Sequence, residues 1–448
     1  MIRIVDQSSM KCIVHFNNNE DIYFSPSGLQ MGYGNRIETG IQVKELLAKT
    51  VKELKRYKIY NAGINISALI SCAGMESIRD IVEGIVLGNY EQRKFTGIES
   101  DEYILELFGY SNENKEQVHE LFQESITLMQ GVVFARDMVN MPGNKLRPMD
   151  FAKEIIRFME DVPVEYELLN YDQLMMMEMN GLTGIGGSSE YLPCFLVLKY
   201  LPEKGSQDIQ GLIGKGVTCD TGGYCLKSAG LMTGIKGDMA GGAAVAGAIY
   251  ALAKNKMNKN VIGFIPMCEN RISPGSLLPG DVITSYSKKT IEVVNTDAEG
   301  RLILADAVTY AVEEEHVSRI LDIATLTGSV VNMLGFSVAG VISDNQGFFD
   351  EFRRAYKSSG EQYWRLPFYP EHEKMIESKI ADIKNIGGAV CGTITAGLFI
   401  RSFTKGRPWL HIDIAGTAWV DTPVYEFQTV GATGAGVTTL YHLCCKKG

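Results

Sequence analysis

Two carboxylates lie close together in the segment NTDAEGR, residues 295–301. Asp297 and Glu299 are two residues apart, after a predicted strand and before a predicted helix. In an extended segment, side chains at i and i+2 point the same way, so both carboxylates could face one cation. The segment could instead begin a helix, with Thr296 or Asp297 as the N-cap and Glu299 in the first turn. Taken alone, it favours the helix cap.

A glycine-rich segment at 214–238, GKGVTCDTGGYCLKSAGLMTGIKGD, adds charged side chains. Four of them could take part in chemistry: Lys215, Asp220, Lys227 and Asp238. The segment is not a nucleotide-binding loop, because Ile209 stands where that motif has Gly and Gly216 replaces its Ser or Thr. A surface loop with solvated charges is the alternative. The many glycines lie beside CLK, LMTG and DMAGGAAV, whose apolar residues we expect to be buried. This favours a functional site over a surface loop.

The charges of the two segments can be summed. The four carboxylates are those of Asp220, Asp238, Asp297 and Glu299. Burying them together without compensation would be prohibitively costly. Two divalent cations would balance them, as in hydrolytic sites that activate a water between two metals. Lys227 and Arg301 then remain to polarise a scissile carbonyl and hold an oxyanion. Lys215 could be a metal ligand only as a neutral amine, and nearby positive charge depresses a lysine pKa.

Other kinds of site find less support in the sequence. The six histidines form no HExxH or other close pair, and no GxSxG elbow is present. The nine cysteines contain no CxxC pair, which fits a reducing compartment. The net charge of −10 argues against a nucleic-acid partner. The N-terminal residues do not resemble a signal peptide, and the longest small-apolar run, 240–253, is too short to cross a bilayer. We therefore expect a cytoplasmic protein with no membrane partner.

The elements that position these residues follow an alternating pattern. In the second part of the chain, apolar runs alternate with helical periodicity, which predicts an α/β fold with a largely parallel sheet and helices on both faces. Four runs end in Gly or polar clusters: GLI before GKG, EVV before NTDAEG, LDI before ATLTG and HIDI before AGTA. Ligands bind outside the carboxyl ends of such strands, so the four exits could converge on one cleft.

The pattern also predicts individual elements and domains. Expected strands include 64–70, 209–213, 261–265, 291–294, 319–323 and 410–414, and expected helices include 41–55, 77–87, 115–139, 149–159, 238–253, 302–315 and 431–443. Asn140–Pro148, NMPGNKLRP, is a breaker and a plausible domain junction. We therefore predict an N-terminal α/β domain at 1–131, a junction at 132–148 and a C-terminal domain at 149–448.

The motifs resemble those of the leucyl aminopeptidase (cytosol aminopeptidase) family of two-metal exopeptidases. NTDAEGRL at 295–302 looks like the signature octapeptide of that family, and GKGVTCDTGGYCLK at 214–227 is similar to its metal loop. Further similar blocks are DMAGGAAV (238–245), ENRISPGSLLPGD (269–281), DIATLTGS (322–329), ADIKNIGG (381–388) and HIDIAGTAW (411–419). Asn140–Pro148 resembles the family's domain junction. The likeness covers the chain from about residue 132 onward.

The resemblance implies a role for each matching residue. One metal, in the tighter site, would be held by Lys215, Asp220, Asp238 and Glu299. The other would be held by Asp220, Asp297 and Glu299, so that Asp220 and Glu299 bridge the two. Lys227 would polarise the substrate carbonyl, and Arg301 would bind a bicarbonate ion that takes a proton from the bridging water. The backbone of Leu326 would contact the substrate, and the side-chain pocket would include Ile235, Thr325, Gly328, Ala415 and Ala418.

The resemblance further implies an overall organisation and an activity. The fold would have a divergent N-terminal α/β domain and a larger catalytic α/β domain with a mostly parallel sheet. The protein would release the N-terminal residue of peptides through a metal-bridging hydroxide, with Zn or Mn, or else Mg, as a homohexamer built from two trimers. Cys219 and Thr221 depart from the family pattern beside the ligands. An additional DNA-binding or regulatory role and a non-catalytic scaffold are the alternatives.

Overall fold

The computed structural model describes residues 1–19, 21–33, 37, 39–96 and 102–445. The chain divides into two compact units, Met1–Val133 with Asp421–Val430, and Phe134–Val420 with Gly431–Gly448. The late segment, Asp421–Val430, was predicted to belong to the C-terminal domain. No pattern in its sequence indicates that it packs with the first unit. Glu426 anchors it there: its carboxylate pairs with Lys52 at 2.8 Å, and its N–H donates to the Glu45 carboxylate at 2.8 Å.

The first unit is built on a six-stranded sheet of order β1-β6-β5-β2-β4-β3. Its strands are β1 (Ile2–Ile4), β2 (Cys12–Asn17), β3 (Ile22–Ser25), β4 (Gly28–Gly32), β5 (Asn61–Asn65) and β6 (Ile104–Phe108). Its helices are α1 (Gly40–Arg56), α2 (Ser67–Ala73), α3 (Ser77–Asn89) and the first part of α4 (Lys115–Asn140). Among the described strands of this sheet, β3 alone pairs antiparallel, with β4. Buried apolar residues on facing sides of α1 and α3 form its helical layer.

The second unit is built on a nine-stranded sheet of order β16-β15-β18-β14-β9-β11-β8-β7, with β10 also paired to β11. The strands are β7 (Glu165–Leu169), β8 (Cys194–Tyr200), β9 (Ile209–Gly214), β10 (Gly216–Asp220), β11 (Asn260–Asn270), β14 (Arg319–Ala324), β15 (Ala339–Ser343), β16 (Tyr363–Arg365) and β18 (Trp409–Asp413). The centre, β18-β14-β9-β11-β10, is parallel, and antiparallel pairs occur toward both edges. The predicted fold class is confirmed.

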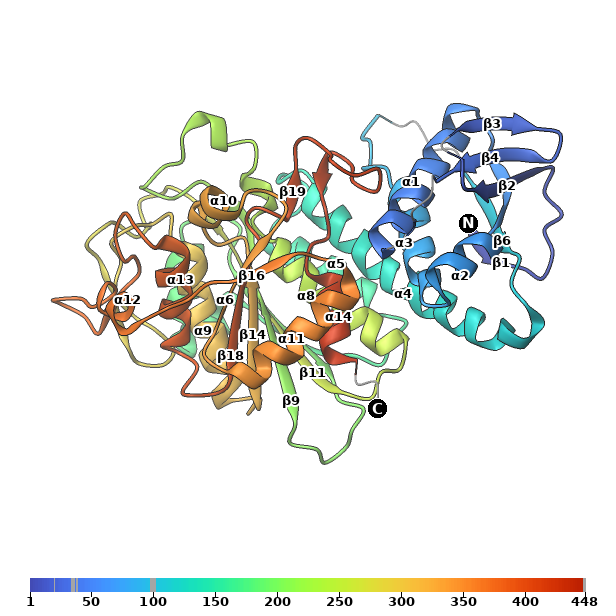
Figure 1. Cartoon of the computed structure of the whole chain (residues 1–448). Coiled ribbons are helices and arrows are strands. Elements are labelled where there is room, and N and C mark those ends of the chain that lie inside the picture. Colours follow the sequence, from blue (N-terminus) through green and yellow to red (C-terminus); the bar gives the residue numbers. More distant parts are fainter. Residues whose placement is uncertain (20, 34–36, 38, 97–101, 446–448) are drawn as a thin grey trace. The chain divides into compact units, whose positions relative to one another are not determined.

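Helices cover both faces of this sheet. Figure 1 shows α9 and α13 on one side and α8, α11 and α14 on the other. The helices are α5 (Pro148–Phe158), α6 (Tyr171–Met176), α7 (Asn180–Gly186), α8 (Ala240–Lys254), α9 (Glu299–Glu313), α10 (Gly328–Leu334), α11 (Gln346–Ser359), α12 (Pro370–Lys374), α13 (Gly392–Arg401) and α14 (Val437–Cys444). Two small sheets complete the unit, β12 (Val282–Thr284) with β13 (Thr290–Glu292) and β17 (Ile383–Lys384), and β19 (Trp419–Val420) with β20 (Gly431–Ala432).

The sequence explains how tightly these layers pack. All eleven residues of β11 are buried, as expected for a central strand covered on both faces. Helix α8 begins with small residues because it lies against the sheet: a Cβ at Gly241 would be 2.1 Å from the carbonyl oxygen of Ile323. This close approach brings the start of α8 beside the ends of β9 and β14, where the chemically active segments begin.

Three expected elements are wrong in part. Residues 64–70 were predicted as a strand, but β5 ends at Asn65 and α2 begins at Ser67. The run at 291–294 lies in the small sheet β12-β13-β17 and not in the central sheet. The expected helix at 431–443 begins only at Val437, because Gly431 and Ala432 form β20. Short apolar runs do not distinguish a strand from a buried helix or reveal which sheet receives them.

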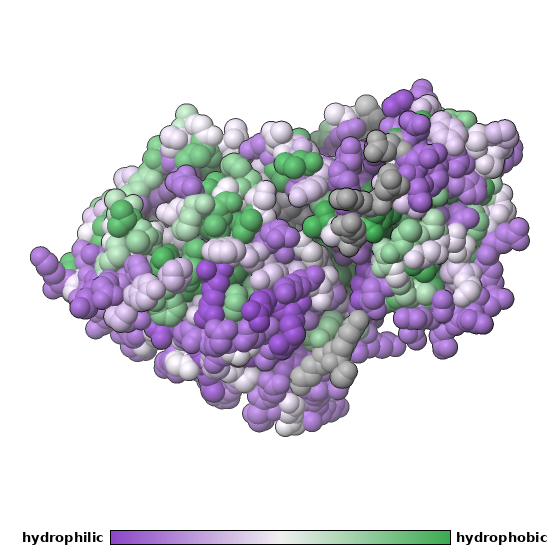
Figure 2. Space-filling model, in the orientation of Figure 1, coloured by the Kyte–Doolittle hydropathy of each residue, from purple (hydrophilic) through white to green (hydrophobic). Residues whose placement is uncertain are grey.

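The surface of the second unit is unevenly polar. In Figure 2, hydrophilic residues gather over α11, whose opposite face buries Phe348, Phe349 and Phe352. Hydrophobic residues gather around α10, where Met333 and Phe336 are 50% and 65% exposed. Across the part of the chain that the structure describes, no helix is both long and apolar enough to pass through a membrane.

Candidate metal centre

The predicted ligands come from three segments beside the central sheet. Lys215 follows β9, and Asp220 is the last residue of β10. Asp238 follows a 3₁₀ turn at Ile235–Gly237 and lies two residues before α8, whose N-cap is Met239. Asp297 and Glu299 lie at the start of α9, after the small-sheet strand β13. The sequence predicted four strand ends around one cleft. Three of them, the ends of β9, β14 and β18, belong to the central sheet. The fourth, at the end of the 291–294 run, belongs to the small sheet β12-β13-β17.

The turn after β10 depends on two glycines. Gly222 and Gly223 have φ values of 85° and 59°, a region that side chains other than glycine disfavour. The turn lets the Lys227 N–H donate to the Thr221 carbonyl at 3.0 Å, which returns the chain toward Asp220. A Cβ at Gly222 would lie 2.9 Å from Oδ1 of Asp297. Residues 214–223 of the glycine-rich segment are therefore ordered backbone against the carboxylates. The expectation of burial is wrong for 224–234, where Leu226 and Leu231 are 56% and 62% exposed, so this part of the segment is a surface loop.

The carboxylates converge. Ligand oxygens of Asp220, Asp297 and Glu299 all lie within 4.8 Å of one another. Asp238 joins them through Lys215, whose Nζ is 2.8 Å from Oδ2 of Asp238 and 2.8 Å from Oε1 of Glu299. Lys227 makes a matching bridge, with its Nζ 2.7 Å from Oδ2 of Asp220 and also in contact with Oδ1 of Asp297. Each ammonium group thus lies between two carboxylates.

Burial and mutual repulsion control the ionisation of these groups. Burial, with the nearby Glu299 charge, raises the pKa of Asp220 to about 6. Burial also raises the pKa of Asp238 well above its usual range. The pKa of Glu299 is lowered despite its burial, because Lys215 and Lys227 both attract its negative charge. Burial disfavours both ammonium groups, but the surrounding carboxylates outweigh it and raise both lysine pKa values. The carboxylates of the site therefore favour the binding of positive charge.

The donor set fits divalent metal binding. Four carboxylates face only two ammonium groups, so the cluster keeps an excess of negative charge. Oε2 of Glu299 is buried and has no hydrogen-bond partner among the described residues. An unsatisfied buried carboxylate oxygen is costly unless a cation binds it. Carboxylate oxygens suit Mg²⁺ and Mn²⁺ and also bind Zn²⁺.

Arg301 lies in the first turn of α9 and is 5% exposed. Its Nη1 donates to the carbonyl of Asn385 at 2.8 Å. Its buried Nε has no hydrogen-bond partner within the described ranges. Burial lowers the pKa of this guanidinium to about 10, which leaves it charged at neutral pH. A buried cation with a free donor is suited to bind an anion.

The predicted substrate-pocket residues are brought together in part. Thr325 follows β14; its hydroxyl donates to Oδ1 of Asp238 at 2.8 Å, and its carbonyl accepts from Nζ of Lys215 at 3.0 Å. The N–H groups of Leu326 and Ala415 both donate to Oδ1 of the buried Asp413, at 3.1 and 3.2 Å. One carboxylate therefore joins the segments that follow β14 and β18.

The remaining pocket residues lie on the same segments. Gly328 is the first residue of α10, and Ala418 lies after β18, with its N–H donating to the carbonyl of Ile414 at 2.9 Å. Ile235 lies in the 3₁₀ turn that precedes Asp238. The structure thus places the predicted pocket positions on the segments that follow β14 and β18 and on the turn before Asp238.

The helix-cap interpretation of NTDAEGR is right in placing Glu299 in the first turn of α9 but wrong about the cap residue. The N-cap of α9 is Ala298, which has no side-chain cap hydrogen bond. Thr296 instead donates its hydroxyl to the Gly222 carbonyl at 2.7 Å and accepts from the Cys225 N–H at 2.8 Å. Its role is to bind the glycine turn to the carboxylate segment.

Asn270 is a site residue that the sequence did not predict. This residue ends β11, is 3% exposed, and donates through Nδ2 to Oδ1 of Asp220 at 2.9 Å and to the carbonyl of Thr296 at 3.0 Å. It therefore orients the Asp220 carboxylate and ties it to the segment that carries Asp297 and Glu299. It lies within a block that resembles the family, but no spacing in the sequence relates it to Asp220.

An acidic cluster at the strand ends of an α/β fold is suited to bind metal ions, and comparisons with known proteins identify the class. Residues 133–441 match the cytosol aminopeptidase family, catalytic domain. The chain is 40% identical to a probable cytosol aminopeptidase of Clostridium perfringens, over 93% of this chain and 86% of that protein. It is 36% identical to one of Treponema denticola, over 96% of this chain and 92% of that protein.

A solved structure agrees over almost the whole chain. The bottromycin maturation enzyme BotP in complex with Mn is 26% identical, with a TM-score of 0.88, and the match covers 99% of this chain and 98% of that one. The chain belongs to the cytosol aminopeptidase family and is a metal-dependent aminopeptidase of the leucyl aminopeptidase type. The expected family and enzyme class are confirmed, and an additional DNA-binding role or a non-catalytic scaffold is not favoured.

Proposed function

We propose that this enzyme removes the N-terminal residue from peptides with a free α-amine, with two divalent ions held by Lys215, Asp220, Asp238, Asp297 and Glu299. Lys215 would be a ligand as the neutral amine, after metal binding releases its proton. The observation that carries the proposal is the convergence of four carboxylates and two lysines at buried strand ends. Mn²⁺ and Zn²⁺ are the proposed ions, with Mg²⁺ as a further option. The Mn in the BotP complex supports manganese.

Lys227 is the proposed electrophilic group. Two divalent ions, when bound, would polarise the scissile carbonyl and lower the pKa of a water that attacks it. Lys227 is already held at the site by Asp220 and Asp297, and its side chain is 19% exposed, so its ammonium is both oriented and accessible to a substrate. A positive charge held where the carbonyl oxygen becomes negative stabilises the transition state more than the ground state.

Arg301 is the proposed anchor of a bicarbonate ion that serves as proton acceptor. The unpartnered Nε of Arg301 supplies a buried hydrogen-bond donor for an anion. The site residues include no histidine, and its carboxylates are the proposed metal ligands, so an external base would complete the proton transfer. The Arg301 side chain would hold that base through charge-assisted hydrogen bonds.

Leu326 is the proposed backbone contact for the peptide. Its N–H already donates to Asp413. We therefore assign the substrate contact to its carbonyl oxygen, which would accept a hydrogen bond from a substrate N–H. The side chain of the N-terminal residue would enter a pocket bordered by Ile235, Thr325, Gly328, Ala415 and Ala418.

We also propose that the protein is a cytoplasmic homohexamer built as a dimer of trimers, with peptides as its partners and no membrane or nucleic-acid partner. The family supports this assembly, and the exposed Met333 and Phe336 around α10 supply apolar surface that an assembly would bury. Light scattering of the purified protein would measure the mass. A monomer or dimer at micromolar concentration would contradict the hexamer.

The activity is tested with aminoacyl p-nitroanilides and dipeptides, after chelation and then after the addition of Mn²⁺ or Zn²⁺. We expect activity to disappear on chelation and to return with metal. The matched control is the same substrate with an acetylated α-amine, which should not be hydrolysed, because a free amine is required. Absence of turnover with either metal and every unblocked substrate would refute the proposal.

A further inference from the structure

Asn385 is a fully buried residue that neither the proposed ligands nor the proposed catalytic groups include. It follows β17 within the block ADIKNIGG. Its Oδ1 accepts from the N–H groups of Val294 and Asn295 at 2.8 and 3.3 Å. Its Nδ2 donates to the carbonyls of Asn295 and Ala298 at 2.7 and 3.4 Å. An asparagine amide can make four hydrogen bonds, and all four go to the backbone of one short segment.

The segment bound by Asn385 carries the predicted ligands Asp297 and Glu299. It lies between β13 and α9, and α9 begins without a side-chain cap. Within the segment, Asn295 accepts from the N–H groups of Asp297 and Ala298 at 2.7 and 3.3 Å, and the other backbone groups need partners outside it. Asn385 also acts through its main chain, because its carbonyl accepts the hydrogen bond from Nη1 of Arg301. Asn385 is thus the residue that contacts both the guanidinium and the two ends of the ligand segment, whose middle is held by Asn270 and Thr296.

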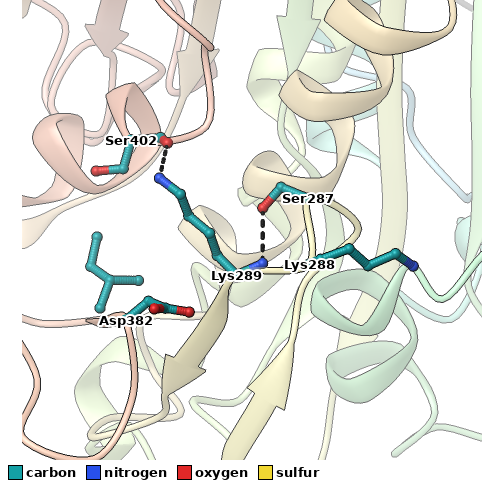
Figure 3. A pocket seen from close by; sticks show the side chains of 6 residues that line it. Ser287, Lys288, Lys289, Asp382 and Ser402 are labelled. Carbon is teal, nitrogen blue, oxygen red and sulfur yellow. Dashed lines mark hydrogen bonds between the residues drawn. The ribbon is translucent and has the colours of Figure 1, made fainter.

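Asn385 is itself held by the small sheet. Its N–H donates to the carbonyl of Glu292 at 3.0 Å, which extends the pairing of β13 with β17. Asp382 strengthens the same pairing by accepting from the N–H and hydroxyl of Thr290, both at 2.8 Å. On its outer side the sheet borders an open cavity of about 420 Å³, across which Lys289 donates to the carbonyl of Ser402 at 2.7 Å (Figure 3). These contacts tie the support of Asn385 to the end of α13.

We propose that Asn385 is a positioning residue, which sets the backbone of 294–298 and the orientation of Arg301 so that the ligands and the anion donor are in place before metal or substrate arrives. Its effect on metal binding rests on the proposed function, whereas its effect on the backbone of 294–298 is independent of that function. Partners that orient metal ligands typically change metal affinity or activity by about 10- to 100-fold when they are removed.

The test compares Asn385→Ala and Asn385→Asp with a matched control, Asn260→Ala. Asn385→Asp keeps the shape and the acceptor atom but loses both Nδ2 donors. Asn260 is 2% exposed and holds another loop in the same way: Oδ1 accepts from Glu203 N–H at 2.9 Å, and Nδ2 donates to the Glu203 and Ser206 carbonyls at 2.9 and 3.4 Å. It begins β11, the strand whose other end carries Asn270.

The first measurement is amide hydrogen exchange of the metal-free proteins. We expect at least about tenfold faster exchange in the 294–301 region for both Asn385 variants, with exchange elsewhere unchanged, and faster exchange only around 203–206 for Asn260→Ala. The second measurement is Mn²⁺ affinity by titration, expected to weaken by about 10- to 100-fold in the Asn385 variants alone. The third is steady-state kinetics at saturating Mn²⁺, where kcat should fall and KM should stay within about threefold, because other segments form the side-chain pocket.

The outcomes separate this inference from the proposed function. Unchanged exchange at 294–301 in both Asn385 variants would overturn the positioning role, as would faster exchange with Mn²⁺ affinity equal to that of the wild type. An equal loss of affinity in Asn260→Ala would also overturn it, because the effect would then be general destabilisation. If the wild type binds no Mn²⁺ and hydrolyses no aminoacyl substrate, the proposed function fails, and the exchange measurement still decides whether Asn385 fixes the segment.

Discussion

A single methyl group at Gly300 would test the geometry of the site directly. Gly300 is the second residue of α9, and a Cβ there would lie 2.6 Å from Cε and 2.7 Å from Nζ of Lys215. Carbon atoms in ordinary contact are about 3.5 to 4.0 Å apart, so Gly300→Ala requires Lys215 to retreat by roughly 1 Å. Lys215 is 2% exposed and its Nζ lies between Asp238 and Glu299, so this retreat breaks at least one contact.

The size of the effect follows from that displacement. A misplacement of about 1 Å in a catalytic site can cost about 100-fold in rate, or about 3 kcal/mol of transition-state stabilisation. Replacing glycine by alanine within a helix contributes up to about 1 kcal/mol to stability, which opposes the cost of moving Lys215. We therefore expect a folded Gly300→Ala variant with kcat/KM for an aminoacyl p-nitroanilide lowered about 100-fold at saturating Mn²⁺.

The matched control is Gly347→Ala. Gly347 is also the second residue of its helix, α11, but the nearest atom to a Cβ there would be Oδ1 of Asn345 at an ordinary 3.4 Å. This variant should keep wild-type activity and gain a similar helix-forming contribution. The reasoning is refuted if Gly300→Ala binds Mn²⁺ and turns over substrate within about twofold of the wild type, because the change then does not disturb Lys215.

Three further perturbations test other parts of the molecule. Asp297→Ala should abolish activity and lower metal content, and full metal occupancy by elemental analysis would contradict its role as a ligand. Arg301→Ala should slow turnover while the metals stay bound, with a defect partly insensitive to added bicarbonate, and unchanged turnover would remove Arg301 from the mechanism. Burial raises the pKa of Asp80 to about 6, so its ionised form destabilises the fold, and the stability present below its unfolded pKa near 4 is lost as the pH rises through 6. Asp80→Asn should therefore gain about 2 to 3 kcal/mol relative to the wild type between pH 4 and pH 7.5 in urea unfolding, and parallel pH profiles for the two proteins would show that Asp80 does not titrate in this range.

Charge and spacing predicted much of the site. Four acidic residues and three cations were recognisable because burying them requires compensation, and the glycines of 214–238 indicated a backbone that approaches something closely. The structure brings Asp220, Asp297 and Glu299 together as that sum requires, and it places Asp238 beside them through Lys215. The fold class followed from alternating periodicities, which local sequence does encode.

Contacts between distant segments could not be predicted in the same way. Asn270 and Asn385 act through hydrogen bonds to backbone groups, and a backbone group has no sequence signature. Thr296 was predicted as a helix cap because threonine hydroxyls both cap helices and hydrogen-bond to neighbouring loops. Only the tertiary fold shows that its hydroxyl donates to the Gly222 carbonyl. The position of the 291–294 run in a separate sheet likewise depends on β17, almost 100 residues later.

The late segment Asp421–Val430 also decides how the polypeptide can be divided. Because the chain belongs to the first unit, then to the second, then briefly to the first again before it ends in the second, no single cut separates the two units. A fragment that begins at Phe134 would keep Glu426 and Phe427 but lose the Lys52 and Lys44 side chains that contact them. Limited proteolysis near residue 133 should therefore yield two fragments that remain associated through the contacts of Asp421–Val430. An engineered variant should for the same reason keep both units in one chain.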